Sequence, residues 1–312
     1  MLRALAGRVV FAIILVVVAF AAAFLVTALA PGELSDDGPL THEQTTAERA
    51  RLRLDQPVAL RLARRLAAAA TLDFGESTAF NRPVLPLLVE RTAVTLTAGL
   101  SALGLAILTG IPLGVLASRT RHRWLRGGIA AVSVLLLSIP ALVVALLLTL
   151  LGASIGLPSF AVMTIALALP AAALLERLQA RAMTTAVDAT CLRAAEARGV
   201  PRTVVTWRHA WPLSLSAVLG VGSIVASHLL SGALAVELIT TRPGLGLLTL
   251  QALMGRDSNL AAACAGMAAL LVGIVTLAGD VVQLSIDPRL RADDSDMATG
   301  GFAASASQEV RP

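Results

Sequence analysis

The sequence has no lysine and no tyrosine, and it carries little charge of either sign. Charged residues make up 14% of its 312 residues and aromatic residues make up 3%, whereas about a quarter of the residues in a typical soluble domain are charged. The arginines stand at the ends of long apolar runs rather than along one face of a helix. The low charge argues against a soluble domain, and the placement of the arginines argues against a nucleic-acid-binding surface.

Metal-binding and nucleotide-binding motifs are missing as well. Cys191 and Cys264 are far apart and show no CxxC or histidine-rich spacing, which argues against a metal site or a disulfide framework. The motif GxxxxGK[ST], with which P-loop ATPases hold phosphates, does not occur in the sequence. We therefore expect the chain itself to bind no metal and no nucleotide.

Long apolar runs are what the sequence has instead. Apolar residues make up 56% of the chain and the mean hydropathy is +0.80. A helix that spans a bilayer needs about 20 mainly apolar residues. Six runs meet this length and predict an all-α, polytopic membrane protein with six transmembrane helices: Val9–Ala30, Thr92–Ala117, Ile129–Leu151, Ser159–Leu178, Leu213–Val236 and Leu260–Leu284.

The first run has an alternative interpretation as a cleavable signal peptide, because Ala28-Leu29-Ala30 resembles a cleavage site. Two features favour a transmembrane helix instead. The run is longer than the apolar region of a usual signal peptide, and Pro31 stands where cleavage would occur.

The arginines also predict the orientation in the membrane, because cytoplasmic loops carry an excess of basic residues. With the N-terminus inside, Arg119, Arg121 and the arginines of residues 177–208 fall on the cytoplasmic side, and the short outside loops hold only Arg242 and Arg256. The first outside loop, about Pro31–Arg91, is the exception with eight arginines. We predict that both termini are cytoplasmic.

The chain divides into four parts on this basis. Residues 1–30 form an N-terminal transmembrane helix, and residues 31–91 form an external loop in which Val58, Leu62 and Leu66 recur at helical spacing after Leu54. This spacing predicts a helix within Thr41–Arg65 and a small external subdomain packed on the membrane face. Residues 92–291 form the membrane core, and the Gly-, Ser- and Ala-rich residues 292–312 are expected to be a disordered cytoplasmic tail.

A basic segment, "CLRAAEARGVPRTVVTWRHAWP" (191–212), separates the fourth run from the fifth. Residues from Asp188 to Arg198 favour a helix, and Gly199 is suited to end it because glycine adopts the left-handed conformation of a helix cap. Pro201 fits the first turn of a second helix, and Pro212 marks the start of the next span. A helix–glycine–helix knob that docks on another protein would fit this pattern. An amphipathic loop lying on lipid headgroups is the alternative.

The spacing within this segment resembles the coupling-loop motif of binding-protein-dependent ABC importer permeases. That pattern reads Glu-Ala-Ala, three residues, Gly, nine residues, Ile, any residue, Leu, Pro. The dipeptide/oligopeptide/nickel branch resembles the segment more closely, although "HAWP" departs from the sequence usual in that branch. Ala194, Ala195, Gly199 and Pro212 match the general motif; Arg193, His209 and Trp211 depart from it; Arg193, Ala195, Ala197, Gly199, Arg208 and His209-Ala210 match the branch.

The resemblance continues through nearly the whole chain to about Arg291. The connection Gly152–Pro158 is a departure, because it is short where relatives often carry a longer external insert. The stretches that resemble the branch are "APGE" (30–33), "LDQP" (54–57), "LDFGES" (72–77), "GIPLGVLAS" (110–118), "SIPAL" (138–142), "LLSGALAVELITTRPGLG" (229–246), "RD" (256–257) and "DVVQLSIDPRLR" (280–291).

The resemblance implies a permease with the type I ABC importer fold in the bacterial plasma (inner) membrane. It implies that the chain is not an enzyme and that it works with a second homologous permease subunit, two cytoplasmic P-loop ATPase subunits that use ATP and Mg²⁺, and an external substrate-binding protein. Dipeptides, longer peptides, nickel chelates, haem and glycosides are the solutes that look-alike systems carry. The residues expected to couple to the ATPases are Arg193, Ala194, Ala195, Glu196, Arg198, Gly199, Pro201, Arg202, Arg208, His209 and Pro212.

Few ionisable residues fall inside the predicted spans, and such residues are candidates for function. His228 and Glu237 are the candidates for the translocation path, although an interior hydrogen-bonded role fits His228 equally well. Glu176 and Arg177 are expected at the inner membrane interface, with side chains that reach toward water, and Asp280 is expected to have a structural role between helices.

Two other functions remain open from the residues alone. An ion-driven secondary transporter would need buried carboxylates or broken helices near the membrane centre, and the candidate acidic residues lie near the ends of the runs. An intramembrane enzyme would need a paired catalytic constellation, for which His228 with Ser227 or Ser231 is a loose candidate without a motif.

Overall fold

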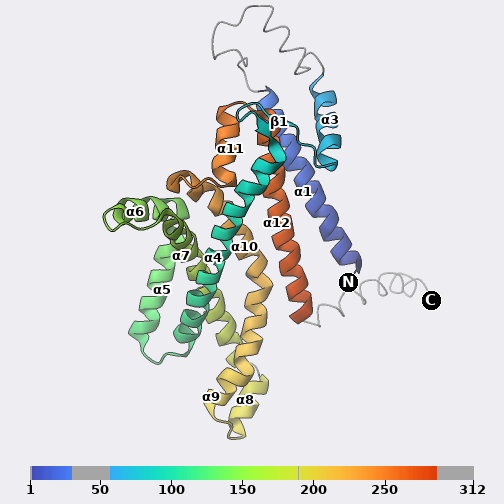
Figure 1. Cartoon of the computed structure of the whole chain (residues 1–312). Helices are drawn as coiled ribbons and strands as arrows, with labels where there is room; N and C mark the ends of the chain where they lie inside the picture. The colour runs from blue at the N-terminus through green and yellow to red at the C-terminus, as the bar shows by residue number, and fades with distance from the viewer. Residues whose placement is uncertain (1, 30–56, 189, 287–312) are drawn as a thin grey trace, which may run out of the picture.

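The computed structural model describes residues 2–29, 57–188 and 190–286. These residues form a helical protein with one short hairpin (Figure 1). The predicted helix at Thr41–Arg65 and the predicted tail lie largely or wholly outside the described residues. The elements in chain order are α1 (Leu2–Leu29), α3 (Val58–Ala70), β1 (Glu76–Ser77), β2 (Arg82–Pro83), α4 (Val84–Arg119), α5 (Arg123–Ser138), α6 (Ala141–Ala153), α7 (Ser159–Val187), α8 (Thr190–Ala197), α9 (Arg202–Val204), the π-helical turn η1 (Val205–Ala210), α10 (Trp211–Thr240), α11 (Leu245–Met254) and α12 (Ser258–Ile286).

Five helical segments within the described residues are long and apolar enough to cross a membrane: Gly7–Ala28, Val84–Arg119, Ser159–Val187, Val205–Thr240 and Ser258–Gln283. They confirm the first, second, fourth, fifth and sixth predicted spans. All five helices are longer than the predicted spans, and α4 and α7 extend furthest beyond them. Helix α4 begins at Val84 rather than Thr92, and α7 continues past Leu178 to Val187.

The prediction of one continuous helix over Ile129–Leu151 was wrong. This stretch consists of α5 and α6, which meet at an angle of 97° and count as a sixth span only when taken together. Ile139 has extended backbone angles of φ −101° and ψ 121°, as expected for a residue before proline, and the ring of Pro140 cannot continue the hydrogen-bond ladder of α5. Figure 1 shows α6 lying across the molecule while α5 runs along its length.

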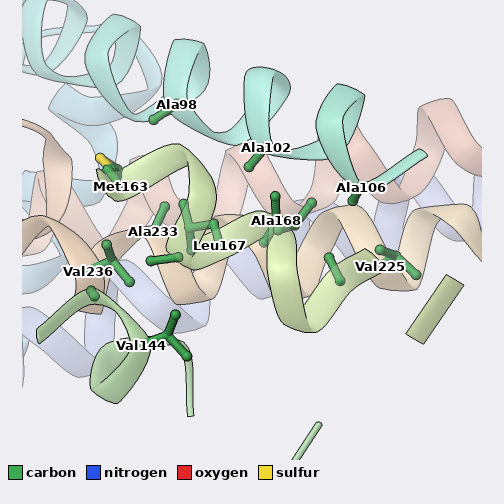
Figure 2. Close-up of a cluster of buried hydrophobic side chains, with 14 of the residues drawn as sticks. Ala98, Ala102, Ala106, Val144, Met163, Leu167, Ala168, Val225, Ala233 and Val236 are labelled. Carbon is green, nitrogen blue, oxygen red and sulfur yellow. The ribbon is translucent and has the colours of Figure 1, made fainter. Parts of the chain in front are cut away.

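The interior of the bundle is built from small side chains. Ala98, Ala102 and Ala106 follow one another at intervals of four residues on α4 and face Met163 and Leu167 of α7 (Figure 2). Val225, Ala233 and Val236 of α10 and Val144 of α6 complete this cluster. Small side chains allow helix backbones to approach closely, which favours association in a bilayer, where lipid tails are as apolar as the side chains themselves.

Helices α4 and α7 approach each other closely. A Cβ atom added to Gly110 would meet the backbone of Ala172, and one added to Gly114 would meet the backbone of Glu176 and the side chain of Gln179. Glycines spaced four residues apart are a recurrent device for such contacts between transmembrane helices. The stretch "GIPLG" therefore fixes α4 against α7, the helix that leads into the basic segment.

One end of the molecule carries α3, the β1–β2 hairpin and α11 (Figure 1). Asp257 is 1% exposed and organises this end. Its Oδ2 atom accepts hydrogen bonds from the hydroxyl of Ser77 (2.7 Å) and the amide of Ala79 (3.2 Å), and its Oδ1 atom accepts one from the amide of Leu260 (3.0 Å) in the first turn of α12. Figure 1 places the hairpin and α11 together at this end, where Asp257 joins the hairpin to α12.

Helix α3 packs on α1, and its assignment to an external subdomain on the membrane face stays a prediction. Val58, Leu62 and Leu66 pack on Phe20 and Phe24 of α1, and the guanidinium of Arg61 lies over the Phe24 ring, 5.7 Å from its centroid.

Helices α1 and α12 lie side by side, and an ion pair joins them. Nη1 of Arg8 is 2.7 Å from Oδ1 of Asp280, which confirms the predicted structural role of Asp280. The first turn of α1 and the last turn of α12 both point toward the end of the molecule that carries α8 and α9 (Figure 1). The two helices therefore begin and end on the side where the basic segment projects.

Candidate coupling and translocation sites

The basic segment folds as a projecting helical knob, which we define as residues 190–210. It consists of α8, a turn at Gly199, α9 and η1, and it forms the tip of the molecule opposite α3 and α11 (Figure 1). Gly199 has φ +86°, a left-handed conformation that residues with a Cβ rarely adopt. The amide of Val200 donates to the carbonyl oxygen of Ala195 (3.2 Å), which closes the end of α8. The predicted first helix and its end at Gly199 are therefore confirmed.

The second limb of the knob is not a separate helix. Pro201 stands just before α9, and its carbonyl oxygen accepts from the amide of Val205 (3.1 Å). Helix α9 then passes through η1 directly into α10, so that Val205–Thr240 is one continuous apolar segment. Pro212 lies within the first turn of α10.

An apolar core fastens the knob to the membrane bundle. Leu192, Val205 and Ala210 from the knob are buried against Val115 of α4 and Met183 of α7. At the base of α10, the side-chain amide of the fully buried Gln179 donates to the hydroxyl of Ser214 (2.9 Å). These contacts hold the knob against α4 and α7 and tie α7 to the start of α10.

The outward side of the knob is small and polar, with one large aromatic exposed. Trp207 is 59% exposed and stacks obliquely on Trp211, with ring centroids 5.8 Å apart. Among the predicted coupling residues, Ala195 is half-buried, the backbones of Arg193, Glu196 and Arg202 lie in α8 and α9, and their side chains are outside the described residues. Ala194, Arg198, Gly199, Pro201, Arg208, His209 and Pro212 are exposed.

His228, the first candidate for the translocation path, lines a pocket within the membrane part of α10. The pocket has a volume of about 340 Å³. Its lining includes Leu137 and Ala141, which flank the bend between α5 and α6, and Pro170 inside α7. His228 is exposed and is the one ionisable residue of this lining. Irregular backbone is tolerated at membrane depth only where it is covered by protein or faces water. The bend and the histidine therefore both indicate surroundings of protein or water rather than lipid.

Glu237, the second candidate, is fully buried near the C-terminal end of α10. Its carboxylate accepts hydrogen bonds from the hydroxyl of Thr95 (2.5 Å), the amide of Gly246 (2.6 Å) and the amide of Leu247. The Thr95 hydroxyl in turn accepts from the amide of Leu245 (2.9 Å). Glu237 and Thr95 together satisfy the amides of the first turn of α11, and thereby hold that helix against α4 and α10.

Glu176 does not reach toward water, as the sequence suggested. It is 3% exposed, and its Oε2 atom accepts a hydrogen bond from the Ser133 hydroxyl (2.6 Å), which ties α7 to α5. The reason is the length of α7. Because this helix continues to Val187, Glu176 lies well inside it rather than at its end. Arg177 is half-buried beside it.

Thr95 is the residue of this arrangement that the sequence did not single out. It is one of several threonines in an apolar run and has no distinguishing neighbour. The spacing of Glu237 to Gly244-Leu245-Gly246 was visible, but it becomes a signal only once a helix is known to begin there. No cluster of histidine, cysteine and acidic residues suited to a metal occurs within the described part of the chain.

Comparison with known proteins identifies the family. The model of the family described as "binding-protein-dependent transport system inner membrane component" matches residues 110–292, more than half of the chain. The chain belongs to this family. It is a permease subunit of an ABC importer, a multi-pass protein of the inner membrane.

Relatives of the permease match along most of its length. A putative peptide transport system permease protein of Brucella abortus is 30% identical over 310 residues, covering 92% of this chain and 98% of the relative. The dipeptide transport system permease protein DppB of Lactococcus lactis is 26% identical and covers 86% of this chain and 92% of its own. The nickel import system permease protein NikB of Staphylococcus aureus is 22% identical and covers 86% and 85%. These matches confirm the resemblance to the dipeptide/oligopeptide/nickel branch.

Proposed function

We propose that this permease imports short peptides and that its knob docks on a cytoplasmic ATPase subunit. Among the relatives named above, those more identical to the chain are named for peptide or dipeptide transport. The permease has no phosphate-binding motif of its own, so it needs ATPase partners, together with a second permease and an external binding protein.

The continuity of the knob with α10 is the observation that carries this proposal. Helix α10 continues directly from the knob, carries His228 on the pocket beside the α5–α6 bend, and carries in its last turn Glu237, which holds α11. A displacement of the knob by a closing ATPase dimer would therefore tilt one rigid helix and reach the opposite end of the molecule. Transmission through a rigid element with two positions is an established form of switching.

The two ends of the molecule then have distinct partners. The knob end faces the cytoplasm, and the end with α3, the hairpin and α11 faces outward and receives the binding protein. His228 lines the path between these ends. Cross-linking in the assembled importer checks the outer assignment. Cross-links from the binding protein should reach α3 or α11, and cross-links confined to the partner permease would contradict it.

Uptake by vesicles tests the proposed cargo. The permease is reconstituted with the second permease, the ATPases and the binding protein encoded beside it, and uptake of a radiolabelled dipeptide is measured. We expect uptake that requires ATP inside the vesicle and the binding protein outside. Uptake of Ni²⁺ but of no peptide by the same vesicles would exclude peptides as the cargo.

Cysteine labelling tests the orientation. Cys191 and Cys264 are first replaced by serine, and a single cysteine is then introduced at exposed positions of each end, Arg198→Cys in the knob and Arg82→Cys in the hairpin. A membrane-impermeant maleimide applied to intact cells, with the outer membrane permeabilised, should label position 82 and spare position 198 until the inner membrane is opened. The reverse pattern would invert the topology.

A further inference from the structure

Three arginines gather at the inner end of the bundle in a pocket that no role described so far requires. Arg126 comes from α5, and Arg177 and Arg181 come from α7, one turn apart. The pocket has a volume of about 590 Å³. Arg126 and Arg181 are exposed and Arg177 is half-buried. Hydroxyl-bearing side chains complete the polar part of the lining: Ser118, Thr184 and Thr185.

These cations have no anionic partner in the described part of the chain. No ion pair and no side-chain hydrogen bond of Arg126, Arg177 or Arg181 is formed there. Glu176 is the one carboxylate of the lining, and it is buried and occupied by the Ser133 hydroxyl. Because three guanidinium groups share the lining with one carboxylate, the pocket carries a net positive charge that attracts an anion into it.

The arginine pocket follows the His228 pocket along α5 and α7. On α7, residues 167, 170 and 174 line the His228 pocket, and residues 177, 181 and 184 continue this row at intervals of three or four residues into the arginine pocket. On α5, Ala130 and Arg126 of the arginine pocket lie about two and three helical turns before Leu137 of the His228 pocket. The two are therefore neighbouring pockets that share α5 and α7 as walls, while α10 contributes to the His228 pocket and α4 to the arginine pocket.

We propose that the arginine pocket is the inner subsite of the translocation path and that it binds a free carboxylate of the cargo. The planar guanidinium matches a carboxylate with two parallel hydrogen bonds. A cluster of arginines favours passage of anions, provided that the cargo also leaves easily, and the exposure of two of the three arginines keeps the subsite weak. The inference rests on the proposed function and narrows its cargo to solutes with a free carboxylate, such as peptides with an unmodified C-terminus.

A lipid phosphate would satisfy the same three cations, but the two neighbouring pockets taken together are not what a lipid-facing surface would have. The row that carries the arginines continues to the pocket of the exposed His228, and an ionisable side chain facing lipid tails at membrane depth is costly. A path filled with water and cargo explains both the arginine pocket and the exposed His228, whereas a lipid-headgroup site explains only the arginine pocket.

Paired cargoes test the proposal in the vesicle assay with the complete importer. The probes are a radiolabelled dipeptide and the same dipeptide with a C-terminal amide. The variant replaces all three arginines (R126Q, R177Q and R181Q), and Arg123→Gln, an exposed arginine of α5 outside the pocket, is the matched control. We expect the triple variant to take up the free dipeptide about tenfold more slowly than the wild type, a change of about 1.4 kcal/mol, and the amide at the wild-type rate.

Comparing variant with wild type for each probe removes the preference of the binding protein itself. A dipeptide that carries a benzophenone and a free C-terminus provides a second measurement, because it should cross-link to α5 or α7 during turnover in the wild type and not in the triple variant. Equal losses for both dipeptides, or cross-links elsewhere in both proteins, would overturn the proposal. A loss that occurs only in vesicles containing phosphatidylglycerol, and not in zwitterionic vesicles, would identify a lipid site instead. If the wild type takes up no dipeptide in an ATP-dependent manner, the proposed function itself fails.

Discussion

Replacing Gly199 by valine is expected to leave the permease inserted in the membrane but to uncouple it from the ATPases. Gly199 has φ +86°, and a β-branched residue in this left-handed region costs about 1 kcal/mol or more. The knob relieves this strain by changing the turn between α8 and α9, which moves the two limbs that dock. We expect co-purification of the ATPases with the tagged permease to weaken about tenfold and uptake to be largely lost.

The surroundings of Gly199 provide a sharp control. A Cβ atom at this position would have no neighbour within 4 Å, so the side chain itself meets no obstacle and the backbone conformation is the whole cost. Asparagine tolerates the left-handed region far better than valine. Gly199→Asn should therefore retain most of the ATPase association and uptake. If the asparagine and valine variants fail alike, the turn conformation is not what docking requires.

Charge reversal in the knob should have a smaller effect than Gly199→Val. Arg198 is exposed, and its Nε atom donates to the carbonyl oxygen of Ala194 (3.2 Å) within the knob itself. An exposed ion pair contributes about 0–1 kcal/mol, so Arg198→Glu should reduce ATPase association only a few-fold. This ranking distinguishes a shape-determined contact from a purely electrostatic one, because the latter would be more sensitive to Arg198 than to Gly199.

The knob was predictable because its shape depends on local chemistry. Glycine at the end of α8 and proline before α9 act on their own backbone, and the same residues produce the same turn wherever they occur. The long apolar helices were predictable for a similar reason, since their length must match the bilayer. The direct continuation of η1 into α10 was not predictable in this way. It depends on the packing of Val205 and Ala210 against α4 and α7 rather than on local sequence.

The bend between α5 and α6 is a feature that local sequence does not determine, because proline does not always interrupt a helix. Three prolines occur inside apolar runs, and only Pro140 separates two helices, whereas Pro112 and Pro170 lie within continuous helices. Pro112 is surrounded by Gly110 and Gly114, which lock α4 onto the backbone of α7. Tertiary contacts of this kind hold a helix together across a proline, and they join residues that are far apart in the sequence.

The sequence predicted which residues are candidates for the translocation path but not the surroundings of each. Sequence alone selected His228 and Glu237 because ionisable residues are rare in spans, but it could not separate them. The structure gives them different surroundings. His228 is exposed on a pocket, whereas Glu237 has no exposed surface and is surrounded by hydrogen-bond donors. The arginine pocket was not predictable, since Arg126 and Arg177 meet only because α5 and α7 pack together.

Replacing Glu237 by leucine is expected to detach α11 and abolish transport. The substitution keeps the volume of the side chain roughly constant but removes the acceptor of the Thr95 hydroxyl and of the amides of Gly246 and Leu247. Each buried donor left without a partner costs about 1–3 kcal/mol, so the first turn of α11 loses several kcal/mol and should separate from α10. The folded fraction of the purified permease should fall by size-exclusion chromatography, and uptake should fall to background.

Two matched variants separate hydrogen bonding from packing at this site. Glu237→Gln keeps one acceptor oxygen in the same place, so it should retain part of the folded protein and part of the uptake. Gly246→Ala keeps every hydrogen-bonding group but adds a methyl group where the backbone of Leu234 lies, so it should be nearly as damaging as Glu237→Leu. If Glu237→Leu folds normally and transports at the wild-type rate, α11 does not depend on the carboxylate. The carboxylate of Glu237 would then not be needed to hold α11, and this result would favour its assignment to the translocation path.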